Sequence, residues 1–337
     1  MKLLISTFFF LISLACHSNI YEYNSNIYEY NSIDKKVASY PTFRDAKTLT
    51  IRISNDFKTD IEKARAIFTW IALNVKYNDD YNSIYINKTH NIYFSEYQKN
   101  RARQKKEADI IKYVFNSKEA NCYGYSILYK TLCNKLHIES QIIYGLTKSS
   151  INDIGIDRVI KDHAWNSVKI NNKWELIDVT WSAGYQDMLT KKFIKSFNDF
   201  YFLTSPKELI NDHFPAKKQW QLIENTINLE EFFATPILYS AYFNSNLKIA
   251  KQHSGILYIT KNTKTITLHF DTIPQKTNLH ALMDNDFRAK KIVVKKNKIS
   301  GYLVTLKVKN KNAKSLTIFN NGEAVIGFKI ETQNNNL

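Results

Sequence analysis

Cysteine is scarce in this chain of 337 residues, which has only Cys16, Cys122 and Cys133. Cys122 and Cys133 lie 11 positions apart in one predicted helix, which is about 16 Å along the helix axis at roughly 1.5 Å per residue. A disulfide requires Cα atoms within about 7 Å of each other. With Cys16 assigned to the N-terminal leader, we expect no internal disulfide and a free thiol at Cys122.

Metal-binding and phosphate-binding signatures are also missing from the chain. No CxxC or HExxH motif occurs, and the eight glycines form neither a GxGxxG motif nor a phosphate-binding loop. We therefore predict that the protein uses no metal and no cofactor.

Acidic residues are in deficit, because 47 Lys and Arg against 31 Asp and Glu give a net charge of +16. This balance favours anionic partners, but no nucleic-acid-binding motif accompanies it, so we expect no nucleic acid as a partner. Between Arg288 and Lys314 there are ten Lys or Arg and no acidic residue. Many of them alternate with apolar residues, which indicates a solvated strand face; a functional anion-binding face is the alternative.

The N-terminal apolar run, residues 3–15, has only 13 residues. That is too short for a membrane span and typical of a signal peptide. Cys16 follows Ala15 directly, as in a bacterial lipobox, although Ser13 stands where leucine is usual. We predict a signal peptide over residues 1–15 and lipidation of Cys16. The protein would then be exported and anchored to a membrane of the cell envelope; plain secretion and an uncleaved anchor are the alternatives.

Residues 16–40 contain the sequence NIYEYNS twice in succession, at 19–25 and 26–32. Two copies of seven residues are far too short for a solenoid, whose repeats begin near about 20 residues. The segment is dominated by Asn, Ser and Tyr. We interpret it as a tether that holds the globular part away from the membrane, and a β-prone adhesive segment is the alternative.

Hydrophobic periodicity in the middle of the chain predicts helices first and strands after them. We expect helices over 59–78, 107–117 and 122–136, a long polar loop over 79–107 that could cover a site, and strands over 139–147, 163–170 and 173–181. The pair Asn171-Asn172 indicates a tight hairpin turn between the last two strands. This order predicts an α+β domain over residues 41–228.

The remainder of the chain, residues 229–333, contains short apolar segments at regular spacing, separated by Asn, Gly and Lys. Regularly spaced short strands predict a second, all-β domain that resembles a sandwich.

Cys122, His163 and Asp178 supply, in chain order, the three roles of a nucleophilic triad. A thiol attacks as the thiolate, which a helix N-terminus favours. A neighbouring imidazole can hold and return the proton, and a carboxylate can orient the imidazole. A turn centred between residues 171 and 172 pairs positions whose numbers add to 343, so His163 faces position 180. Asp178 is two positions away and therefore on the same face of the sheet.

The fragments that carry these residues resemble the transglutaminase-like superfamily, in the branch of kyphoscoliosis-type and cytokinesis-associated domains. The matching stretches are EKARAIFTWIALNVKYN, NCYGYSILYKTLC, HAWNSVKINNKWELIDVTWSAG and DFYFLTSPKELINDHFPAKKQWQL, which together span roughly residues 45–225. The resemblance implies a papain-like core, in which helices pack on an antiparallel sheet. It also implies that Cys122 is the nucleophile, His163 the acid and base, and Asp178 the orienting group.

Other residues near the triad receive structural interpretations. Cys133 falls on the apolar face of its helix, and His213 in HFP is interpreted as a strand or loop clamp. Tyr123 and Asn166 are weaker candidates for lining a cleft. One departure from the family is Glu119, which precedes Ala120 and Asn121 where a small residue is common before the cysteine. A carboxylate near the thiol would oppose thiolate formation.

Two functions follow from this pattern. The first is a cell-envelope cysteine enzyme that acts on amide bonds of a protein or peptide, either as a protease or amidase or by transglutaminase-like acyl transfer. The second is a non-catalytic scaffold or binding protein with the same fold.

Overall fold

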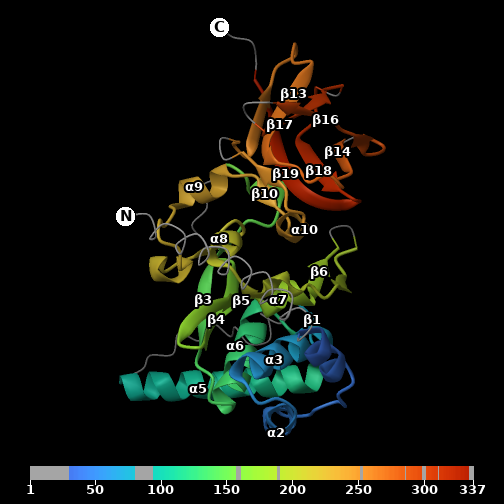
Figure 1. Ribbon diagram of the computed structural model, residues 1–337. Coiled ribbons are helices and arrows are strands. Elements are labelled where there is room, and N and C mark those ends of the chain that lie inside the picture. The colour runs from blue at the N-terminus through green and yellow to red at the C-terminus, as the bar shows by residue number, and fades with distance from the viewer. Residues whose placement is uncertain are drawn as a thin grey trace, which may run out of the picture. The chain divides into compact units, whose positions relative to one another are not determined.

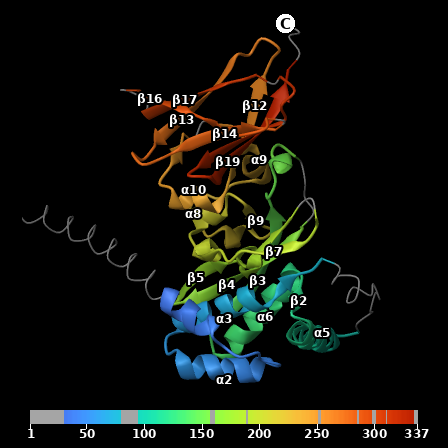
Figure 2. The same cartoon turned by 90° about the vertical axis from the view of Figure 1, so that its right-hand side faces the viewer.

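The computed structural model describes residues 30–79, 94–156, 161–187, 190–250, 253–284, 286–297, 301–309 and 311–333 (Figures 1 and 2). The predicted signal peptide, the predicted lipidation site Cys16 and most of the duplicated NIYEYNS segment lie outside these residues. The chain divides into two compact units: residues 1–142 with 164–203, and residues 143–163 with 204–337. This division differs from the predicted domain boundary at residue 228. Among the described residues, no helix is both long and apolar enough to span a membrane.

The first unit is built around helix α6, Cys122–Lys135, which contacts four other helices. These are α2 (Ala46–Asp56), α3 (Asp60–Asn74), α5 (Glu96–Ser117) and α7 (Val179–Ala183). The helix predicted over 59–78 begins at Asp60, where Thr59 and Glu62 form a reciprocal capping box. Its apolar stripe is fully buried and forms one core with the inner faces of α2 and α6.

Two sequence predictions are wrong in this unit. The polar loop predicted over 79–107 is helical from Glu96 onward, because α5 continues through EYQKNRARQKKE as far as Ser117. These residues are good helix formers, although their mostly exposed faces give no apolar stripe. The tether predicted over 16–40 gives way to a helix at residues 30–38, whose Ile33 and Val37 are buried in the core.

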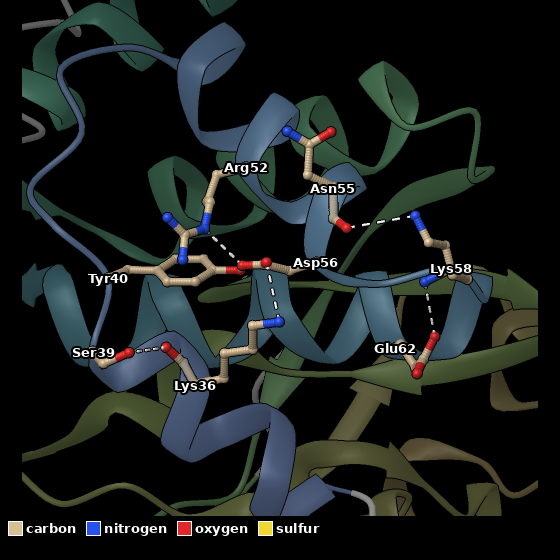
Figure 3. Close-up of polar contacts among 8 residues, drawn as sticks. All are labelled: Lys36, Ser39, Tyr40, Arg52, Asn55, Asp56, Lys58 and Glu62. Atoms are coloured by element: carbon tan, nitrogen blue, oxygen red, sulfur yellow. Dashed lines mark hydrogen bonds and ion pairs between the residues drawn. The ribbon is translucent and has the colours of Figure 1, made fainter.

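A polar network joins the end of this first helix to α2 (Figure 3). The Asp56 carboxylate accepts hydrogen bonds from the Tyr40 hydroxyl at 2.8 Å and from Arg52 Nε at 2.6 Å, and it pairs with Lys36 at 3.0 Å. The Arg52 guanidinium also lies over the Tyr40 ring, 4.9 Å from its centre. The network therefore joins the helix at residues 30–38 to α2.

The antiparallel sheet has the strand order β8-β5-β4-β3-β9. Its strands are β3 (Ser140–Thr147), β4 (His163–Ile170), β5 (Lys173–Ile177), β8 (Phe202–Thr204) and β9 (His213–Pro215). β4 and β5 form the predicted hairpin, and Ile170 pairs with Lys173 as the register requires. Asn171 and Asn172 both have positive φ, of 50° and 64°, which matches a two-residue turn of the primed type.

Each unit also contains short elements. In the first unit these are β1 (Lys76–Tyr77), β2 (Glu119–Ala120), β6 (Gly184–Gln186), β7 (Phe193–Lys195) and the turn η2 (Asp199–Tyr201). In the second unit they are η1 (Ile151–Asp153), α8 (Pro206–Leu209), η3 (Lys218–Gln221), α9 (Leu229–Ala234) and α10 (Ser240–Asn244).

The C-terminal part of the second unit is a sandwich of two mainly antiparallel sheets, as predicted, in which β12 pairs with β19 in parallel. One sheet has the order β10-β19-β18-β14-β15, with β12 added beside β19, and the other has the order β11-β13-β17-β16 (Figure 1). The strands are β10 (Ile237–Leu238), β11 (Lys248–Ile249), β12 (Ile256–Ile259), β13 (Thr265–Thr272), β14 (Leu279–Met283), β15 (Lys290–Lys291), β16 (Val293–Asn297), β17 (Gly301–Lys307), β18 (Ser315–Asn320) and β19 (Glu323–Thr332). Inward residues of both sheets, such as Leu268 and Val304 from one and Ile318 and Phe328 from the other, form one buried core.

Candidate active site

Cys122 is the first residue of α6, and it is only partly buried. Asn121 caps the helix, with its side-chain oxygen accepting the Gly124 N–H at 3.0 Å. The first N–H groups of a helix point outward and carry partial positive charge, and Cys122 lies at this end of α6. Cys122 and Cys133 are both free thiols.

A hydroxyl near the start of α6 connects the helix to β4. Ser126 Oγ lies 2.9 Å from the carbonyl oxygens of both Cys122 and Ala164, and these two acceptors share its one proton. The buried Asn166 adds a second link, because its Nδ2 donates to the Ser126 carbonyl at 3.0 Å and to the Gln141 carbonyl at 3.2 Å. The start of α6 is thereby held beside the start of β4, where His163 immediately precedes Ala164. Asn166 has this bracing role and was predicted as a weak candidate for lining a cleft.

Asp178 follows β5 directly and has no exposed surface. The sequence predicted a strand as far as residue 181, but the chain turns into helix α7 at Val179, with Asp178 as its N-cap. Its Oδ1 accepts the backbone N–H groups of Thr180 at 2.7 Å and Trp181 at 3.1 Å. These bonds fix the plane of the carboxylate, which suits a group that orients a neighbour.

His163, Asp178 and His213 lie together, with one nitrogen or oxygen atom from each within 4.8 Å of the others. His163 and Asp178 are two of the three residues predicted for the triad. Cys122 is not a member of this group. Two imidazoles and a carboxylate can move protons between them, and they are also a ligand set that zinc accepts.

His213 was interpreted from the sequence as structural, and its place in this group was missed. Its ring centre is 5.4 Å from that of His163, and its Nδ1 lies 2.5 Å from Asp212 Oδ1. A carboxylate on one ring nitrogen fixes the tautomer and directs the other nitrogen away. The only signal in the sequence was the adjacent pair Asp212-His213, which is too common to identify a site.

Tyr77 is a second residue that the sequence did not single out. It lies in β1, paired with Ala120 of β2, two positions before Cys122. Burial raises the pKa of its hydroxyl, and so do a hydrogen bond with Asp79 and the charges of Cys122, Asp79 and Asp178. The charges of Cys122 and Asp178 in this set place both residues within electrostatic range of the same hydroxyl.

Glu119, which the sequence marked as a threat to the thiolate, has a specific partner. Its Oε2 accepts a hydrogen bond from Asn78 Nδ2 at 2.9 Å. In β2 its neighbour Ala120 is fully buried while Glu119 is only partly buried, as expected when successive side chains of a strand point to opposite faces. The carboxylate is therefore held by Asn78.

Cys133 has the packing role predicted for it, and Tyr123, predicted as a candidate for lining a cleft, also packs against the core. Cys133 is wholly buried in the core, and burial raises the pKa of its thiol far above the usual range. Tyr123 packs partly buried against the same core. Among the described residues, His163, Asp178 and His213 are the ones that could hold a metal ion; the predicted absence of a metal rests on missing sequence motifs alone.

Comparisons with known proteins place this region in a family. Residues 47–179 match the model of the transglutaminase-like superfamily. Kyphoscoliosis peptidase of Homo sapiens is 29% identical over 211 residues, which cover 62% of this chain and 29% of that protein. Hillarin of Drosophila melanogaster is 27% identical over 230 residues, covering 62% and 25%. Cytokinesis protein 3 of Schizosaccharomyces pombe is 31% identical over 147 residues, covering 43% and 16%.

The chain therefore spans less than a third of the length of each of these relatives. A solved structure titled "Crystal structure of a TGase" aligns with a TM-score of 0.28 and 14% identity over 56% of this chain and 43% of that chain, which is too distant to assign roles. The matched segment contains Cys122 and His163 and ends one residue after Asp178. Residues 47–179 of this α+β core, which a β-rich domain follows, match the transglutaminase-like superfamily, and the relatives of this core include kyphoscoliosis peptidase and cytokinesis protein 3.

Proposed function

We propose that this protein is a cysteine-dependent enzyme that acts on amide bonds in proteins or peptides. Cys122 is the nucleophile, His163 the general base and acid, and Asp178 the group that orients the imidazole. The observation that supports this most directly is the grouping of His163 with the buried Asp178, while Ser126 holds the start of α6 beside the residue that follows His163.

The reaction begins when His163 takes the proton of the Cys122 thiol. The thiolate sulfur then forms a bond to the amide carbonyl carbon, and the backbone N–H of Cys122 is in place to stabilise the oxyanion. His163 returns the proton to the leaving amine as the C–N bond breaks, which leaves a thioester. Transfer of the acyl group to water makes the enzyme a protease or amidase, and transfer to an amine makes it a transglutaminase-like acyl transferase.

Of the two acyl acceptors we propose water first, which makes the reaction a hydrolysis, because kyphoscoliosis peptidase is named for peptide cleavage. We also propose that the protein acts at the cell envelope as a lipoprotein anchored through Cys16, on the strength of the short apolar run and the cysteine that follows it. Replacing Cys16 with Ser would then release the protein from the membrane fraction, whereas retention there would contradict lipid anchoring.

A non-catalytic scaffold is the second candidate. It is favoured by the absence of Cys122 from the His163, Asp178 and His213 group and by relatives named as cytokinesis proteins. A scaffold would need the fold and its surfaces but no activated thiol, so the reactivity of Cys122 separates the two candidates.

The deciding experiment measures alkylation of Cys122 by iodoacetamide, with each cysteine followed separately by peptide mass mapping. An activated Cys122 reacts near pH 6 at least about tenfold faster than a cysteine in an unstructured model peptide, whose thiol ionises at about pH 8.5. His163→Ala and Asp178→Asn should remove most of this advantage, while Cys133→Ala, which changes only a buried thiol, should leave it unchanged. A Cys122 that reacts no faster than the free thiol in the folded protein would rule out the enzyme and leave the scaffold. An activity probe for cysteine hydrolases, with Cys122→Ala as the control, would then test for acylation.

A further inference from the structure

Residues 287–296 of the second unit form a surface that mixes cations with exposed apolar side chains. We call this the edge patch and define it by Phe287, Arg288, Lys290, Lys291, Val293, Val294, Lys295 and Lys296. Phe287 is exposed to 108% of its reference area, Val293 to 65% and Val294 to 36%. All the cations of the patch are exposed as well.

One short segment supplies an edge strand to each sheet of the sandwich. β15 lies at the end of one sheet, where Lys291 pairs with His280 of β14, and β16 lies at the end of the other, where Lys295 pairs with Leu303 of β17. Between them Ile292 is buried, and its N–H donates to the Leu279 carbonyl at 3.0 Å. This anchor holds both strands in place, so the edge patch is part of the folded sandwich.

Positive charge dominates the patch. Residues 286–297 carry five cations and one carboxylate, which gives 5 − 1 = +4. The carboxylate, Asp286, is already paired with Lys290 at 2.7 Å. The neighbouring strands β14 and β17 contain no acidic residue. The electrostatic potential at the patch is therefore positive, and it attracts anionic surfaces.

Two simpler explanations account for only part of this surface. Lysines on edge strands prevent unwanted pairing with other chains, but that purpose is not served by a fully exposed Phe287 or by exposed valines. Nucleic acid would use the lysines for phosphates and Phe287 for base stacking, but it gives no favourable contact for Val293 and Val294. An anionic bilayer uses both kinds of side chain in the patch, because cations bind the headgroups while aromatic and aliphatic side chains enter the acyl boundary.

We propose that the edge patch is a docking surface for anionic phospholipid bilayers. Phe287 and Val293 insert at the level where headgroups meet acyl chains, and Arg288, Lys291, Lys295 and Lys296 contact lipid phosphates. This function goes beyond the proposed enzyme activity, and it does not depend on lipid at Cys16.

The test is binding of the full chain to phosphatidylcholine vesicles with and without phosphatidylglycerol, measured by co-sedimentation. All variants carry Cys16→Ser, so that a covalent lipid is absent and other N-terminal contributions are equal. The double variant Lys295→Glu, Lys296→Glu is expected to lower binding to the anionic vesicles at least about tenfold. Phe287→Ser should lower it by roughly tenfold as well, and added salt should weaken the parent more than the double variant.

The matched control is Lys217→Glu, Lys218→Glu, which makes the same change of charge at two exposed lysines of the same unit outside the patch. Its loss of binding should be much smaller. Equal binding of the parent to neutral and anionic vesicles, or equal losses in the two double variants, would overturn the proposal. Retention on single-stranded DNA that depends on Lys295 and Lys296, without vesicle binding, would reassign the patch to nucleic acid. Circular dichroism melting of each variant confirms that the exposed substitutions leave the fold intact.

Discussion

Arg65 carries a buried positive charge, and Asp34 is its main ion-pair partner. Its side chain is 2% exposed, and its Nε and Nη2 donate to the two oxygens of Asp34 at 2.9 and 2.6 Å. The guanidinium also lies against the rings of Tyr30, Phe68 and Phe202. These contacts attach the first helix to α3, so the ion pair has a structural role.

Replacing Asp34 with Ala should therefore destabilise the protein by about 3 kcal/mol, because it leaves a buried guanidinium without its carboxylate. The control is Asp199→Ala, which removes a carboxylate 3.9 Å from the same guanidinium but 65% exposed; its cost should stay below about 1 kcal/mol. Urea unfolding of both variants measures the difference. Equal losses of unfolding free energy in the two variants would show that Asp34 is not the partner that stabilises buried Arg65.

The hairpin, Asp178 and His213 differ in how far their structure could be predicted from the sequence. The hairpin register predicted from Asn171 and Asn172 is confirmed, because turn chemistry and strand period are local. That Asp178 leaves the strand to cap α7 depended on two backbone N–H groups beyond it. The position of His213 depended on β9 pairing with β3, a contact between distant segments, so no local pattern could predict it.

At the scale of elements, the close fit of α6 against β2 depends on Gly124. A Cβ added to Gly124 would lie 2.9 Å from the Cβ of Ala120, which is closer than real Cβ atoms approach. Gly124 lies in the first turn of the helix, so this approach sets where the helix, and with it Cys122, begins.

Gly124→Ala should destabilise the protein by about 1–3 kcal/mol through overpacking, although Ala is the better helix former by about 1 kcal/mol. It should also change the alkylation rate of Cys122, since the helix start has to shift. Adding Ala120→Gly removes the opposing Cβ and should recover much of both effects. Thermal unfolding and iodoacetamide labelling test this, and a single variant as stable as the parent would show that the helix can move without cost.

Helix α5 shows that hydrophobic periodicity predicts only the part of a helix that is buried. Its predicted start near residue 107 came from the apolar residues at its C-terminal end, where Ile110, Val114 and Phe115 are buried. The preceding turns are polar on all sides, with Ser95 as N-cap, so propensity and capping specify them without a hydrophobic period.

At the scale of the whole molecule, stability at acid pH should depend on the Asp56 network. Burial favours the protonated carboxyl, but hydrogen bonds from Arg52, Tyr40 and Lys36 outweigh it and lower the pKa of Asp56 to about 2. The unfolded chain has a pKa near 3.8 at this residue. A depressed folded pKa stabilises the protein above the unfolded pKa, and this contribution is lost as the pH falls from about 4 to about 2.

Asp56→Asn should therefore cost stability at neutral pH and cost progressively less as the pH falls through that window. Asp109→Asn, at an exposed position of α5, is the control and should show a small effect that does not vary with pH. Denaturant unfolding at a series of pH values measures the difference from the parent. A constant difference across the window would contradict the network.

Lys148 is a second group whose folded pKa is depressed, and it affects how stability varies at neutral and alkaline pH. It is 1% exposed, and its Nζ donates to the carbonyl oxygens of Phe232 at 2.8 Å and Thr235 at 3.1 Å and to the Thr235 hydroxyl at 2.5 Å. Burial lowers the pKa of Lys148 to about 7, and the charges of Asp212 and Asp153 oppose this only in part. Between about pH 7 and pH 10.5 the unfolded chain holds a proton at this residue that the folded chain lacks.

Stability must therefore rise with pH across that window, because the unfolded state binds more protons there. Below about pH 7 both states are protonated, and the folded state bears the full cost of a buried ammonium group. Lys148→Met removes this titration together with three hydrogen bonds, whose loss adds a constant offset. Its unfolding free energy subtracted from that of the parent should be flat below about pH 7 and rise above it. Lys217→Met, at an exposed lysine of the same unit, should give no such slope, and parallel curves for the parent and Lys148→Met would mean that the buried lysine keeps its proton.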